Sequence, residues 1–78
     1  MAQSVYSVIE VVGTSDKSWE DAAKQAIETA AGTLEDVRIA EVVKQDVTLE
    51  DSRATHYSKA THYRVRLNIS FKYHPEKL

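Results

Sequence analysis

Residues 5–12 carry apolar side chains at odd and even positions alike. Successive side chains of a strand point to opposite faces, and a strand with one face in water alternates apolar with polar residues. The two apolar sets are Val5, Ile9 and Val11 on one face and Tyr6, Val8 and Val12 on the other. The pattern predicts a two-faced strand that ends at a turn over 13–15, where Gly13 permits an unusual backbone.

An amphipathic helix is predicted from about Trp19 to Gly32. Ser18 is the expected N-cap, and Glu20 and Asp21 place negative charge at the positive end of the helix dipole. The apolar stripe consists of Trp19, Ala22, Ala23, Ala26, Ile27, Ala30 and Ala31. Its small residues allow close approach to a sheet, and we expect Trp19 to anchor the stripe in the core. One helix covers only one face of that sheet.

Two further strands follow, giving the order β-α-β-β. The second, over about 37–49, has an odd apolar row of Val37, Ile39, Val43, Val47 and Leu49, with Ala40 and Val42 at even positions. The third alternates strictly, with Tyr63, Val65, Leu67, Ile69, Phe71 and Tyr73 on the face that we expect to pack under the helix. We predict one α+β domain over residues 1–78, with a three-stranded antiparallel sheet.

A short tandem repeat lies between the second and third strands. The tetrapeptide Ala-Thr-His-Tyr occurs at 54–57 and again at 60–63. We interpret the repeat as a duplication that lengthened a hairpin, because loops tolerate insertion at small thermodynamic cost. A dedicated binding loop is the alternative. Either tyrosine would extend the hairpin ladder.

Size and composition favour self-association. A chain of 78 residues buries only about 60% of its unfolded surface when it folds alone. It has no cysteine for a disulfide or a cysteine zinc site, so association with other copies is the expected substitute. No apolar run approaches the roughly 20 residues of a membrane span. We therefore expect a cytoplasmic protein without a membrane partner.

Other functional classes have weak support. The formal charge of −2 gives no general attraction to nucleic acid, and the basic row Arg64, Arg66 and Lys72 lies on the face opposite the tyrosines. No spacing of Ser, His and Asp singles out a nucleophile, so we expect no enzyme. His56, His62 and His74 match no zinc motif.

The sequence resembles the dodecin family over nearly the whole chain. The resemblance rests on Gly13-Thr14-Ser15 joined to a Ser-Trp-Glu helix start, a Glu-Val-Val strand at 41–43, a Tyr-Arg-Val segment at 63–65, and Phe71. It implies a small subunit whose twelve copies close into a hollow shell of cubic symmetry. In dodecins the best-known ligands are riboflavin and its nucleotides (FMN), stacked in pairs between tryptophans and hydrogen-bonded by a glutamine. The family stores or buffers flavin rather than turning over a substrate.

This chain departs from the flavin pattern at two positions. By the resemblance, Ile39 stands where flavin-binding members have the tryptophan, and Arg64 stands where they have the glutamine; Gln45 lies nearby on the second strand. Stacking on an aromatic face is worth roughly 1 to 3 kcal/mol. Isoleucine has no such face, so we expect impaired flavin binding. A flavin dodecin with an altered pocket is the alternative, in which Arg64 meets a flavin carbonyl or phosphate.

A branch of dodecins that lacks the tryptophan has been described as binding calcium, and this chain resembles it in the Gln45-Asp46 pair. The nearest acidic cluster is Asp46, Glu50 and Asp51. Calcium needs six to eight oxygens, which threefold symmetry can supply by repeating one carboxylate. A solvated hairpin end is the alternative. We also expect Arg64 to pair with Glu41 across the sheet.

Overall fold

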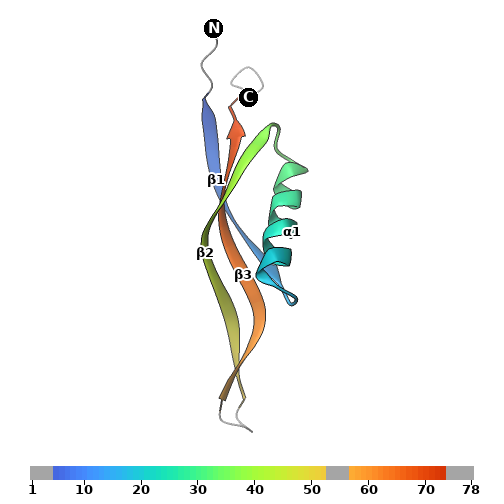
Figure 1. The fold of residues 1–78 in the computed structure, drawn as a ribbon, viewed down its shortest axis with the longest axis vertical. Helices are drawn as coiled ribbons and strands as arrows, with labels where there is room; N and C mark the ends of the chain where they lie inside the picture. Colours follow the sequence, from blue (N-terminus) through green and yellow to red (C-terminus); the bar gives the residue numbers. More distant parts are fainter. Residues whose placement is uncertain (1–4, 53–56, 74–78) are drawn as a thin grey trace.

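The computed structural model describes residues 5–52 and 57–73, which form the predicted β-α-β-β order. The elements are β1 (Tyr6–Ser15), α1 (Trp19–Ala31), β2 (Val37–Ser52) and β3 (Tyr57–Lys72). The sheet is antiparallel with β3 in the centre, in the order β1-β3-β2. Helix α1 lies on one face of the sheet, and the far half of the β2–β3 hairpin extends beyond it (Figure 1).

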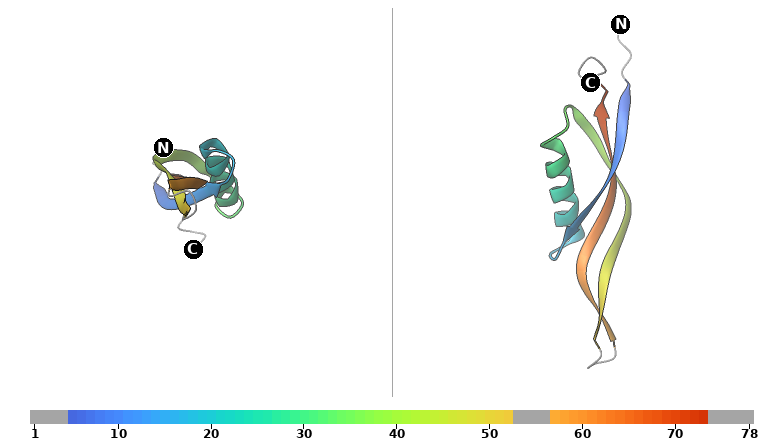
Figure 2. Two further views of the ribbon diagram at one scale, coloured as in Figure 1. Left: turned by 90° about the horizontal axis from the view of Figure 1, so that it is seen from below. Right: turned by 180° about the vertical axis from the view of Figure 1, so that it is seen from behind.

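The core lies between the alanine stripe of α1 and the odd-numbered residues of β3, as predicted. Val65, Leu67 and Ile69 are fully buried, and Ala22 and Ala30 are buried opposite them. Each large side chain contributes on the order of 1.5 to 3 kcal/mol when buried. The helix covers this face alone, as the two further views make plain (Figure 2).

The opposite face, which bears the even-numbered residues of β3, is here called the helix-free face. Tyr6, Val8 and Val12 of β1 lie on it, because they pair with Lys72, Ser70 and Arg66. Ile39 of β2 also pairs with Ser70. These four apolar side chains are exposed, Val8 by 55% and Ile39 by 62%. The predicted two-sided character of the first strand is confirmed, and its second face has no cover within the described chain.

The first strand runs further than predicted. Residues 13–15 continue the ladder with β3, where Gly13 pairs with Val65, so the predicted turn at these positions is wrong. Gly13 does not have a positive φ. A Cβ there would lie 2.2 Å from the Ala22 carbonyl oxygen, so the glycine is needed for close approach of the helix.

The alternation predicted for the second strand is also wrong. Irregularities between Val37 and Ile39, between Val42 and Lys44, and between Thr48 and Leu49 shift the register against β3. The extra residues Arg38 and Val43 lie in β2 and move the β2 side chains that follow them to the other face. At the third irregularity the extra residue is Thr61 of β3. Val37 and Ala40 therefore pack toward the core, whereas Ile39 is exposed.

Both ends of the helix follow their sequence signals. Ser18 has an extended backbone, and its Oγ accepts a hydrogen bond of 3.0 Å from the Asp21 amide. The helix ends at Ala31 with Gly32 as the C-cap. Gly32 has a φ of −71°, however, and the left-handed residue before β2 is Asp36.

The chain is far longer than a compact domain. Its radius of gyration is 16.8 Å and its extents are 64 × 20 × 19 Å. A compact domain of this length has a radius of gyration of about 11.5 Å. The excess comes from the long hairpin, in which Tyr57 begins β3 and Tyr63 continues it. The prediction that the tyrosines extend the ladder is confirmed; residues 54–56 of the repeat lie outside the described residues.

Candidate functional site

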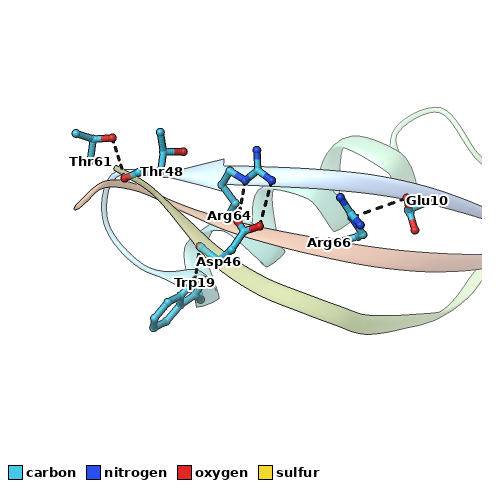
Figure 3. Close-up of polar contacts among 7 residues, drawn as sticks. All are labelled: Glu10, Trp19, Asp46, Thr48, Thr61, Arg64 and Arg66. Atoms are coloured by element: carbon cyan, nitrogen blue, oxygen red, sulfur yellow. Dashed lines mark hydrogen bonds and ion pairs between the residues drawn. The ribbon is translucent and has the colours of Figure 1, made fainter. Parts of the chain in front are cut away.

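Arg64 and Asp46 form an ion pair on the helix-free face, at the point where the hairpin leaves the helix. They are opposite each other in the β2–β3 register. Arg64 Nε donates to Asp46 Oδ1 at 2.7 Å, and its Nη2 donates to Asp46 Oδ2 at 3.1 Å (Figure 3). The ion pair is bidentate, so one edge of the guanidinium faces both carboxylate oxygens.

This contact corrects the pairing expected for Arg64. Glu41 lies opposite Asn68, and Arg64 takes Asp46 as its partner instead. Arg66, two residues along the same face, has its Nε 3.9 Å from Glu10 Oε1. The error arises because strand pairing depends on the register, which the bulges of β2 set.

The charges around Asp46 lower its pKa. The hydrogen bonds from Arg64 are the main cause, and the positive charges of Arg64, Lys44 and Arg66 add to it. The same hydrogen bond raises the pKa of Arg64. Lys44 lies opposite Arg66 in the next row of the same face, so Asp46 is one carboxylate beside three cations.

Trp19 holds the helix start against this part of the hairpin. Its Nε1–H donates to the Asp46 carbonyl oxygen at 3.0 Å, and its ring meets Tyr63 edge to face with centroids 5.1 Å apart. Trp19 is 37% exposed and lies outside the core cluster, so the prediction that it packs in the core is wrong. The backbone of Asp46 is thereby fixed independently of its side chain.

The three predicted flavin-pocket positions do not converge within one chain. Ile39 and Arg64 share the helix-free face, but Ile39 lies opposite Ser70, six residues from Arg64 along β3. That spacing is about 20 Å in an extended strand. Gln45 pairs with Val65 and therefore lies on the other face. Exposed Ile39 has no ring, and Asp46 occupies one of the two hydrogen-bonding edges of Arg64, the one formed by Nε and Nη2. Within one chain these residues do not form a pocket for a stacked flavin.

Among the side chains that the structure describes, Asp46 and Glu50 of the predicted acidic cluster do not come together. Glu50 pairs with Lys59 and lies four residues from Asp46 along β2, which is about 13 Å in an extended strand. The side chain of Asp51 lies outside the described residues. Within residues 5–52 and 57–73, no three His, Asp or Glu side chains gather closely enough to hold a metal ion.

Two other features lie apart from these positions. A groove of about 390 Å³ runs between β1 and α1, lined among others by Ile9, Val11, Gln25, Ala26, Thr29 and Thr33. It contains none of the predicted site residues. His62 is exposed opposite Thr48, while His56 and His74 lie outside the described residues. No helix in the described chain is long and apolar enough to cross a membrane.

The fold and the sequence together define the class of protein. The family model for dodecin matches residues 5–74, and the chain belongs to the dodecin family. It is 42% identical over 72 residues to the calcium dodecin of Mycobacterium tuberculosis, covering 92% of this chain and 93% of that protein.

Solved structures agree with this assignment. The crystal structure of the Mycobacterium tuberculosis calcium dodecin, described as calcium chelating with a novel calcium-binding site, matches with a TM-score of 0.71 at 39% identity. The match covers 91% of this chain and 93% of that one. The dodecin of Streptomyces coelicolor matches with a TM-score of 0.80 at 30% identity, over 95% of this chain and 97% of that one.

Proposed function

We propose that this protein is a non-enzymatic dodecin that assembles into a homododecameric shell in the cytoplasm and binds a small ligand, with calcium favoured over stacked flavin. The observation that carries the choice of ligand is Ile39, an exposed aliphatic side chain at the position where the resemblance places the stacking tryptophan. The identity of 42% to a calcium dodecin supports the same choice.

The exposed apolar residues of the helix-free face support the assembly. Val8 and Ile39 flank Ser70 of β3 from its two sides, so they form one patch across the sheet. Burying such side chains against further copies is favourable by about 25 cal/mol per Å². The elongated hairpin, which α1 does not cover, offers a second surface for neighbouring copies.

Calcium in this proposal is held by carboxylates of several copies around a symmetry axis. Asp46 is the weakest of the three predicted calcium ligands, because its carboxylate is already paired with Arg64. The positive charges of Lys44 and Arg66 nearby would also repel a metal ion. Glu50, which is exposed near the hairpin end, and its neighbour Asp51 are the stronger ones. Calcium prefers oxygen ligands of this kind.

Two titrations of the assembled wild-type protein test the proposal. We expect calcium to bind by isothermal calorimetry, and we expect riboflavin to keep its fluorescence at micromolar protein concentration. The variant Glu50→Gln should weaken calcium binding at least about tenfold. The matched control Glu28→Gln, on the exposed side of α1, should leave it unchanged. Quenching of riboflavin fluorescence with submicromolar affinity would instead favour the alternative, a flavin dodecin with an altered pocket.

A further inference from the structure

Three basic side chains lie beside Asp46 on the helix-free face. Arg64 lies opposite Asp46, and Lys44 and Arg66 face each other in the adjacent row of the helix-free face. Same-face neighbours in adjacent rows of a sheet lie about 7 to 8 Å apart, within reach of long side chains. Glu10 partly neutralises Arg66 from the β1 side.

The ion pair has little value as a stabilising contact. The side chains of Arg64 and Asp46 are 40% and 38% exposed, and pairs that exposed are screened by water and salt. The main consequence of the ion pair is therefore its effect on which groups Arg64 can bind. A guanidinium edge matches a phosphate or a carboxylate equally well, and Asp46 occupies the Nε–Nη2 edge of Arg64 with both of its oxygens.

We propose that Asp46 is a specificity-determining residue whose carboxylate takes the place of a ligand phosphate on Arg64, so that this surface rejects phosphate-bearing ligands. The inference deepens the proposed function, on which it rests for treating the hairpin surface as ligand-facing. The excluded ligands are those that carry a phosphate group, and the residue that excludes them is Asp46 rather than Ile39. The ion pair lies within one chain, so its effect does not require a partner subunit.

The test is phosphate binding by the full-length protein and its variants. We expect Asp46→Asn to bind inorganic phosphate at least about tenfold more tightly than wild type by isothermal calorimetry, because charge-assisted hydrogen bonds become available. High salt should remove the gain. The asparagine keeps the backbone carbonyl that accepts the Trp19 hydrogen bond, so tryptophan fluorescence reports whether the local structure survives.

Two further variants separate the proposed role from a general change in charge. Glu41→Gln removes a carboxylate from the same strand and the same face, opposite Asn68, and should bind phosphate as wild type does. Asp46→Asn combined with Arg64→Gln should lose the gain. Equal phosphate affinity for Asp46→Asn and Glu41→Gln overturns the inference, and so does a gain that persists without Arg64. Failure of the proposed function has a separate readout, namely wild-type protein that is monomeric or does not bind calcium.

Discussion

Single residues set the limits on what this subunit can pack and bind. Gly13 is the clearest packing case, because its missing side chain allows the Ala22 carbonyl oxygen and the Ala26 side chain to approach β1. The oxygen would lie 2.2 Å from an added Cβ, and both β1 and α1 are held by other contacts. Neither neighbour is the free end of a flexible side chain.

We predict that Gly13→Ala destabilises the protein by about 1 to 3 kcal/mol or more, since overpacking forces backbone shifts. Urea unfolding followed by circular dichroism measures the change. Gly32→Ala is the matched control, because its Cβ would meet no atom closer than 3.4 Å and its φ of −71° suits alanine. That control should stay within about 1 kcal/mol of wild type. Equal losses in the two variants would contradict the close-approach explanation.

Ile39 provides the corresponding test for the ligand. We predict that Ile39→Trp raises riboflavin affinity roughly tenfold or more, because it supplies the stacking face. Fluorescence quenching of riboflavin measures the gain. Val43→Trp, at another exposed position of β2, is the control and should give none. Similar quenching by both variants would show that any surface tryptophan suffices.

At the scale of elements, hydrogen bonds around Asp21 fix the start of α1. Ser15 Oγ donates to Asp21 Oδ2 at 2.6 Å, and Gln25 Nε2 donates to the same oxygen at 2.6 Å. These two contacts lower the pKa of Asp21, with Lys17 and Lys24 adding smaller effects. The carboxylate thus joins the end of β1 to the first turns of the helix.

The lowered pKa of Asp21 predicts a pH dependence with a definite sign. Stabilisation by this carboxylate is fully present above its ordinary pKa of 3.8 and is lost as the pH falls through the lower folded value. We predict that Asp21→Asn is less stable than wild type at neutral pH and that the gap closes below pH 3.8. Urea midpoints measured across this range check it. A gap that is constant with pH would contradict the assigned role.

The elements differ in how far their sequence determines them. The strict alternation of β3 and the capping signals of α1 were sufficient to predict these two elements, because each signal is a local sequence pattern. The side-chain faces of β2 were not predictable from its sequence, since its bulges are backbone irregularities that the two-residue period does not encode. The Arg64–Asp46 pair was missed for the same reason. Trp19 was misplaced because a helical stripe does not show where the sheet beneath it ends.

At the scale of the whole molecule, one face of the sheet and half of a hairpin lack a partner within the described chain. We predict that Val8→Asp lowers the assembled mass, because burying an unpaired carboxylate in an interface is costly. Val8 is exposed in the single chain, so the subunit itself should still fold. Lys24→Glu, on the exposed side of α1, is the control and should keep the wild-type mass. Size-exclusion chromatography with light scattering distinguishes the two.

The mass of the wild-type particle in solution tests the proposed shell most directly. Sedimentation equilibrium at micromolar concentration should give about twelve times the 8.8 kDa of one chain. A well-folded species of one or two chains would contradict the assembly, and with it the proposal that ligands are held between copies.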